Sequence, residues 1–181
     1  MVKTIFENSI LSLVIIAQIL IVLYIVGFFV KRKNPNSPFV KALGDNGFKL
    51  AFMAALISTF GSLFYSDILG YEPCKFCWFQ RIFMYPQTIL LGIALWRKDW
   101  NMYFYSITLS VIGGLIAFNH YILQTTGSSI IPCSAVGQSV SCSKVFVMHL
   151  GYITIPFMAL TGFTLMTLAM VFYKQTHEAS R

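Results

Sequence analysis

Residues 10–30 read ILSLVIIAQILIVLYIVGFFV, an apolar run interrupted only by Ser12 and Gln18. A helix needs roughly 20 mostly apolar residues to cross the hydrocarbon of a bilayer, so this stretch is long enough to span a membrane. Basic residues follow the run rather than precede it, and no pair of small residues typical of a cleavage site ends it. Both features favour a retained helix over a cleaved signal peptide.

The composition of the whole chain leads to the same conclusion. Of its 181 residues, 57% are hydrophobic and 16% aromatic, whereas only 10% are charged. Soluble domains carry about 25% charged residues. Because backbone groups in lipid must be hydrogen-bonded within the segment, the sequence predicts an all-α integral membrane protein.

Four more apolar stretches follow the first. They are Leu50–Ile68, Ile82–Trp96 with an extension back to Trp78, Met102–Leu123, and a stretch within Val145–Tyr173 centred near Ala159. The pattern therefore predicts five membrane-spanning helices.

The charges mark the expected orientation. The connections expected on one side carry nine of the 13 Lys and Arg residues: Lys31, Arg32, Lys33, Lys41, Lys49, Arg97, Lys98, Lys174 and Arg181. Lys3, Lys75 and Lys144 fall on the other side, and Arg81 falls within a span. Cytoplasmic loops carry the excess of basic residues, which predicts a cytoplasmic C-terminus. The net charge of +7 lies in short clusters rather than along a basic stripe, so we expect no nucleic-acid partner.

All four cysteines fall in two connections that this topology places outside the cell membrane. Cys74 and Cys77 form a Cys-x-x-Cys motif directly before the third span, where unpaired N–H groups and the helix dipole stabilise a thiolate. Cys133 and Cys142 lie in the other outer loop, where disulfides persist. A static disulfide in either pair, or a zinc site, is the alternative interpretation. The spacing of the second pair fits zinc poorly.

Two further residues lie near the motif. Arg81 follows Cys77 by four positions, so the two share a helix face one turn apart. A charged residue within a span either reaches the interface or faces a partner, and position alone does not decide between these roles. His120 closes the fourth span at a similar depth, where a lone histidine is usually a satisfied surface group.

The segment Cys74-Lys75-Phe76-Cys77-Trp78-Phe79-Gln80-Arg81-Ile82-Phe83-Met84-Tyr85-Pro86 resembles the CxxC-aromatic-x-QR segment of the DsbB family, especially its BdbC-like branch. The order of helices and cysteine pairs is also similar from about Leu50 to Tyr173. The resemblance implies a four-transmembrane-helix bundle in residues 50–181, preceded in residues 1–49 by an additional N-terminal transmembrane helix and a basic cytoplasmic linker.

Members of this family are bacterial membrane thiol oxidases. The resemblance implies that the chain lies in the cytoplasmic membrane, reoxidises an extracytoplasmic, DsbA-like thioredoxin-fold dithiol oxidase, and passes electrons to ubiquinone or menaquinone of the membrane quinone pool. Cys77 then resembles the cysteine that faces the quinone, and Cys74 its partner. Cys133 resembles the cysteine that forms the mixed disulfide with the soluble protein, and Cys142 the resolving cysteine. Arg81 and His120 resemble the quinone-binding residues.

Two other functions are consistent with parts of the pattern. One is a non-enzymatic membrane subunit with two structural disulfides, which predicts cysteines resistant to mild reductant. The other is a quinone reductase similar to vitamin K epoxide reductase. The chain order argues against the latter, because that family carries its CxxC near the last helix of the core.

Overall fold

The computed structural model describes residues 2–128, 130, 131, 133 and 141–178. Arg181, one of the basic residues assigned to the cytoplasmic side, lies outside the described residues. The long helices are α1 (Val2–Lys33), α2 (Pro38–Leu63), α3 (Lys75–Arg97), α4 (Tyr103–Thr126) and α5 (Ile155–Glu178). The short elements are the π-helix η1 (Phe64–Ile68), the 3-10 helix η2 (Trp100–Met102), and the strands β1 (Met148–His149) and β2 (Ile153–Thr154).

Each predicted span corresponds to a long helix, with two differences in position. Helix α2 begins at Pro38 rather than at Leu50, so the predicted basic linker is helical except at residues 34–37, where Pro35 and Asn36 form the turn. The start of the Val145–Tyr173 stretch is not helical, because β1 and β2 pair there as an antiparallel hairpin. Its turn contains Leu150 and Gly151 with positive φ angles of 52° and 76°. A right-handed helix cannot pass through such residues. The last helix therefore begins at Ile155 and is centred beyond Ala159, near Met166.

Four segments among the described residues are long and apolar enough to cross a membrane. They are Lys3–Lys33, Pro38–Ile68, Trp100–Thr126 and Ile155–His177. The all-α membrane fold is thereby confirmed. Helix α3 is not one of the four, because Gln80, Arg81 and Gln87 interrupt its apolar sequence.

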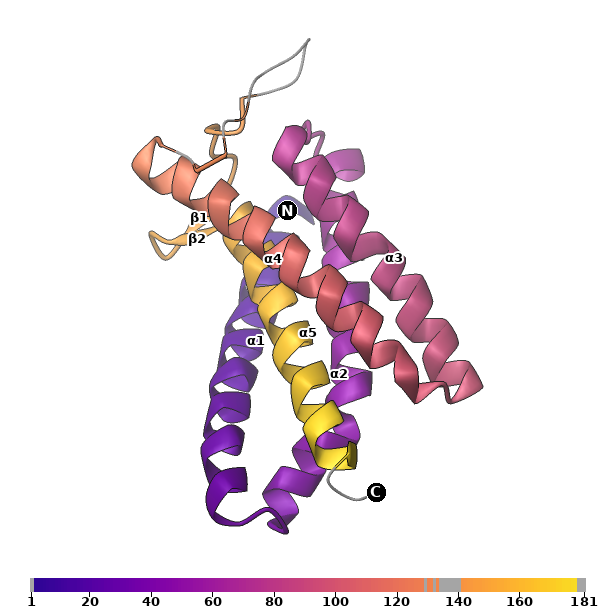
Figure 1. Ribbon diagram of the computed structural model, residues 1–181. Coiled ribbons are helices and arrows are strands. Elements are labelled where there is room, and N and C mark those ends of the chain that lie inside the picture. Colours follow the sequence, from indigo (N-terminus) through magenta and orange to yellow (C-terminus); the bar gives the residue numbers. More distant parts are fainter. Residues whose placement is uncertain (1, 129, 132, 134–140, 179–181) are drawn as a thin grey trace.

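Helices α2, α3, α4 and α5 form a ring in which each packs against the next, and α5 closes the ring against α2. Helix α1 lies outside this ring against α5 and α2 (Figure 1). The N-terminal end of α1, the start of α3 and the end of α4 lie toward one end of the bundle, and the α1–α2 connection and the end of α5 lie toward the other (Figure 1). Both cysteine pairs therefore belong to the same end.

The contact between α3 and α4 has a polar centre. Gln87 is fully buried, and its Oε1 accepts hydrogen bonds from Ser106 Oγ at 2.8 Å and Ser110 Oγ at 3.0 Å. Its Nε2 donates to the carbonyl of Phe83 at 2.8 Å. A buried amide with its groups paired holds two helices in one register, whereas an unpaired one costs free energy.

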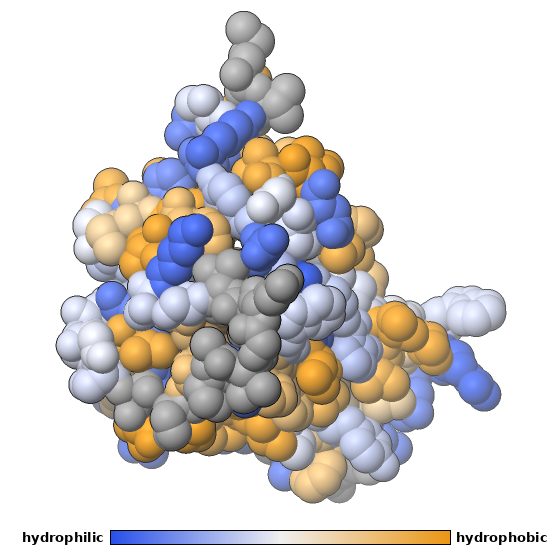
Figure 2. All heavy atoms as spheres, turned by 90° about the horizontal axis from the view of Figure 1, so that it is seen from above, coloured by the Kyte–Doolittle hydropathy of each residue, from blue (hydrophilic) through white to orange (hydrophobic). Residues whose placement is uncertain are grey.

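Large apolar side chains are exposed along the outer faces of the long helices. Examples are Val22, Phe60, Ile89, Phe104 and Leu115, each more than half exposed. Such a continuous apolar surface is expected for helices that face hydrocarbon. At the cysteine-bearing end, polar side chains are spread over the surface, with apolar surface reaching the edge on several sides (Figure 2).

Candidate active site

Cys74 is the N-cap residue of α3. It follows Pro73 in an extended conformation, and its Sγ accepts a hydrogen bond from the backbone N–H of Cys77 at 3.4 Å. The Sγ atoms of Cys74 and Cys77 lie 3.0 Å apart, and both cysteines are free thiols. The helix start thus directs the N–H group of Cys77 toward the sulfur of Cys74, where it favours a thiolate.

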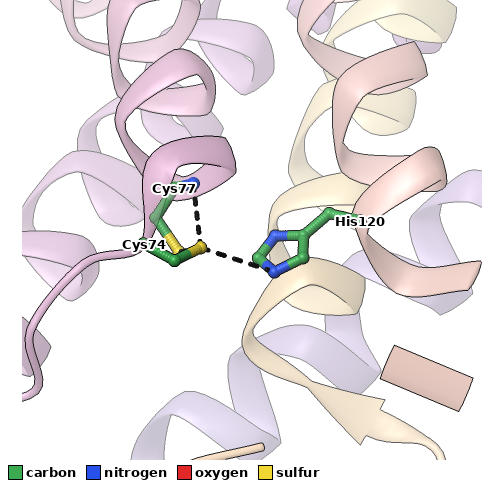
Figure 3. A group of neighbouring side chains, drawn as sticks. All are labelled: Cys74, Cys77 and His120. Atoms are coloured by element: carbon green, nitrogen blue, oxygen red, sulfur yellow. Dashed lines mark hydrogen bonds between the residues drawn. The ribbon is translucent and has the colours of Figure 1, made fainter. Parts of the chain in front are cut away.

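His120 on α4 faces this pair and is 1% exposed (Figure 3). Its Nε2 lies 3.6 Å from Cys74 Sγ and 3.0 Å from the carbonyl oxygen of Cys142, and its Nδ1 lies 3.0 Å from Nε2 of Gln80. A carbonyl oxygen only accepts, so Nε2 of His120 carries the proton. In the neutral ring Nδ1 then accepts from the Gln80 amide. The two contacts agree on one tautomer, in which His120 presents an N–H toward Cys74.

The second cysteine pair lies against the first. Cys133 and Cys142 form a disulfide, with their Cα atoms 6.3 Å apart. Cys74, Phe76 and Cys142 make one buried cluster, and Cys77 and Cys133 pack against it at its edge. Cys142 is 2% exposed, whereas Cys133 is half-buried. All four cysteines therefore meet at one end of the bundle, with Cys133 as the more accessible member of its pair.

The two thiols of the motif differ in their electrostatic environment. The hydrogen bond from the Cys77 thiol lowers the pKa of Cys74 below its ordinary value, and the contact with His120 lowers it further against the opposing effect of burial. Cys74 is therefore the thiol of the pair whose surroundings favour the thiolate.

Arg81 turns toward α2 rather than along α3 toward the end of the bundle. Its Nε donates to Ser62 Oγ at 3.0 Å and its Nη2 donates to the Ser62 carbonyl at 3.1 Å. The hydroxyl of Tyr85 donates to the same Oγ at 3.1 Å. The guanidinium also lies 5.2 Å from the centre of the Trp78 ring. These contacts use only part of the five N–H donors of the arginine.

A cavity of about 260 Å³ adjoins these residues. One part is polar and lined by Ser62, Glu72, Cys77, Gln80, Arg81 and Tyr85. The remainder is lined mostly by apolar side chains of α1, α2 and α5. An apolar cavity with a few convergent polar groups beside a reactive thiol is the usual form of a small-molecule site.

The structure thus brings together five of the six predicted site residues, namely Cys74, Cys77, His120, Cys142 and Cys133. Arg81 lies with Cys77 on the wall of the cavity. The sequence did not predict Ser62, and it included Gln80 only as part of the Cys74–Pro86 motif. A serine at the end of an apolar span carries no distinctive signal. Gln80 directly before Arg81 in the motif was the available signal for its role beside His120.

The sulfur atoms of Cys74 and Cys77 and a ring nitrogen of His120 all lie within 4.8 Å of one another, a geometry in which three ligands could hold a metal ion. Zinc binds thiolates, and Cys133 and Cys142 are bonded to each other as a disulfide. A zinc site made by all four cysteines is therefore not formed in this structure.

Comparison with known proteins identifies related sequences. Residues 45–173 match the family described as Disulfide bond formation protein DsbB. The chain is 45% identical over 130 residues to the SPbeta prophage-derived disulfide bond formation protein B of Bacillus subtilis. The aligned residues make up 72% of this chain and 84% of that protein.

Two further relatives carry similar names. Disulfide bond formation protein C of Bacillus subtilis is 39% identical over 126 residues, covering 68% of this chain and 89% of that protein. Probable disulfide formation protein C 1 of Bacillus anthracis is 42% identical over 113 residues, covering 62% and 81%. No solved structure matches the chain.

Proposed function

The chain belongs to the DsbB family of disulfide bond formation proteins, and on that premise we propose that it oxidises an extracytoplasmic dithiol protein and passes the electrons to a membrane quinone. The relatives and the four long apolar segments support a bacterial, multi-pass membrane oxidoreductase that forms disulfides. The observation that carries the proposal of a dithiol partner and a quinone acceptor is the meeting of both cysteine pairs around His120.

The relay begins at the more accessible cysteine. A thiolate of a DsbA-like thioredoxin-fold partner attacks Cys133, so that a mixed disulfide forms and Cys142 leaves as a thiolate. The second thiol of the partner then resolves the mixed disulfide, which leaves the partner oxidised and Cys133 and Cys142 reduced. The half-buried position of Cys133 and the burial of Cys142 support this order of attack.

The second step transfers the electrons between the two pairs. With Cys74 and Cys77 oxidised to a disulfide, the Cys142 thiolate attacks Cys74, and Cys133 resolves the resulting bond. Two electrons move inward and the reduced Cys74–Cys77 pair results. Cys74 and Cys142 share one buried cluster, and the ring N–H of His120 contacts both residues. That N–H stabilises the negative charge that develops on the Cys74 sulfur.

The cavity beside Cys77 fits a quinone acceptor. Its polar part offers the guanidinium of Arg81 as a donor to a carbonyl oxygen, and its apolar remainder suits a prenyl tail. A bound quinone would supply a two-electron, two-proton acceptor and leave as quinol, whether ubiquinone or menaquinone. Arg81 is held toward the cavity by Ser62, which fixes the direction of its remaining N–H groups.

We further propose five membrane crossings, with α3 as the least apolar and α1 as the additional N-terminal span. The cysteine-bearing end then faces the outside of the cytoplasmic membrane, and the basic linker and the C-terminus face the cytoplasm. The location of the α1–α2 connection and of the end of α5 opposite the cysteines is consistent with this orientation (Figure 1).

The decisive experiment supplies the purified protein in lipid nanodiscs with a reduced thioredoxin-fold dithiol and follows quinone reduction and partner thiol loss together. We expect stoichiometric coupling of the two, and its loss in Cys77→Ser. If the Cys133–Cys142 disulfide resists mild reductant and the thiols do not react with quinone, the protein is instead a non-enzymatic membrane subunit with structural disulfides.

A further inference from the structure

Helix α1 precedes the residues that match the family, yet it forms one wall of the cavity beside Cys77. Its lining residues recur at the spacing of a single helix face: Ile10, Leu13, Val14, Ile16, Ala17 and Leu20. The charged and amide side chains of the cavity lining, Glu72, Gln80 and Arg81, belong instead to α3 and to the segment before it. The residues of α1 that line the cavity are all apolar.

The helix is attached to the bundle on both sides of this wall. Toward the α1–α2 connection, Tyr24 is fully buried, donates a hydrogen bond to the Leu43 carbonyl at 3.3 Å, and packs edge-on against Phe172. Toward the N-terminus, Phe6 stacks on Phe64 with ring centres 3.6 Å apart. Between these two contacts α1 bridges the cavity.

Small residues on the facing helices explain why space remains there. Ala54, Ser58 and Gly61 of α2 recur at helical spacing, and Ala159 and Gly162 of α5 also line the cavity. At Gly61 a methyl group would already contact Cδ1 of Ile10 on α1, at 3.4 Å. The lining of the cavity extends along α2 from Ser62 to Leu50, a length of roughly 18 Å at the rise of an α-helix.

We propose that α1 binds the prenyl tail of the quinone and thereby sets the preference of the site for tailed over tailless quinones. This inference rests on the proposed function, because it takes the polar part of the cavity as the site of the quinone ring. Ring recognition then belongs to α2 and α3, and tail recognition to α1. The assignment gives the additional helix a role in the choice of acceptor beyond crossing the membrane.

The test is quinone binding to the full chain in nanodiscs, followed by quenching of Trp78, which lies beside Arg81. The probes are decyl-ubiquinone and its tailless parent ring, and a prenylated menaquinone and menadione. Ala17→Phe places bulk in the apolar part of the cavity, and Val22→Phe places the same bulk on a face of α1 that is 57% exposed and does not line the cavity.

We expect Ala17→Phe to raise the dissociation constant of both tailed quinones by about tenfold or more, because several apolar groups of the tail lose burial. The tailless quinones should bind Ala17→Phe as they bind the unmodified protein, and Val22→Phe should change neither. If Ala17→Phe does not fold, Ala17→Leu should give a smaller rise of the same kind.

Equal binding of tailed quinones by the Ala17 and Val22 variants, in a protein that turns over quinone normally, would overturn the role of α1 and leave the proposed function intact. An equal loss of tailed and tailless binding in Ala17→Phe would also overturn it, since α1 would then act on the ring. An unmodified protein that neither binds nor reduces any of the probes would refute the proposed function and this inference with it.

Discussion

The Nε2 atom of His120 lies 3.6 Å from the Sγ atom of Cys74, although the two residues are 46 positions apart in the chain. The contact joins the start of α3 to α4, and the same nitrogen also donates to the carbonyl of Cys142. One imidazole therefore connects the motif at the start of α3 with the outer disulfide.

His120→Phe tests this connection with a substitution of similar volume. Loss of the ring N–H removes one of the causes that lower the pKa of Cys74, so the pKa should rise. The thiolate fraction of the reduced protein near neutral pH should then fall. Alkylation of Cys74 measured against pH by mass spectrometry should shift to higher pH. His149→Phe in β1 is the matched control, and an unchanged Cys74 profile in His120→Phe would contradict the role of the imidazole.

The division between the two cysteine pairs predicts which intermediate accumulates. A partner variant whose second cysteine is replaced by serine can attack the Cys133–Cys142 disulfide but cannot resolve the mixed disulfide, so a covalent complex should build up through Cys133 while Cys142 is released as a thiol. Non-reducing gel electrophoresis detects it directly. Cys133→Ser is the control and should form no such complex at that position; normal turnover of partner and quinone by Cys133→Ser would show that the relay has been drawn incorrectly.

Arg81→Lys keeps the charge but loses the planar group that donates twice to Ser62. We expect a higher KM for quinone while the helical content is retained, and a larger increase for Arg81→Met. Steady-state quinone reduction measures both. Arg97→Met, at the end of α3, provides a control for loss of a positive charge from the same helix. An unchanged KM in Arg81→Met would mean that the arginine only anchors the helix.

Gln87→Leu should lower the stability of the helix bundle while leaving the contacts of the cysteines unchanged. The substitution leaves the hydroxyls of Ser106 and Ser110 without their buried acceptor, at a cost of about 1–3 kcal/mol for each group left unpaired. Unfolding of the protein in mixed micelles measures the change. Combining Gln87→Leu with Ser106→Ala and Ser110→Ala should recover much of the loss, and no recovery would argue against the polar contact as its cause.

The proposed orientation predicts a specific labelling pattern. A membrane-impermeant thiol reagent added outside reduced cells should modify Cys133 before Cys142, because Cys142 is 2% exposed and Cys133 is half-buried. A reporter fused after Arg181 should be active in the cytoplasm. A reporter active only outside would rule out five crossings.

The sequence predicted the helices well because their cause is local. An apolar run of sufficient length, such as residues 10–30, must satisfy its backbone within itself in lipid. The start of the last helix was harder to place, since Val145–Thr154 is apolar as well, yet contains a turn with two positive φ angles and a short hairpin. Hydropathy does not distinguish these conformations.

The contacts of the site depend on packing between segments that are distant in sequence. Arg81 was recognised from its motif, but its partner Ser62 lies on α2 and has no distinctive neighbours. The placement of His120 between Cys74 and Cys142 follows from how α4 crosses the start of α3, which no local pattern specifies. The chemistry of the residues was predictable, and their mutual arrangement was not.

The buried amide of Gln87 also has a consequence for the biogenesis of the protein. Helix α3 lacks the apolar content of its neighbours, and its central glutamine receives both of its hydroxyl donors from α4. Entering lipid alone would leave that amide oxygen unsatisfied, at a cost of several kcal/mol in hydrocarbon. Because α3 and α4 are separated only by residues 98–102, the proposed crossing of α3 costs less free energy if the two helices enter the bilayer as one hairpin.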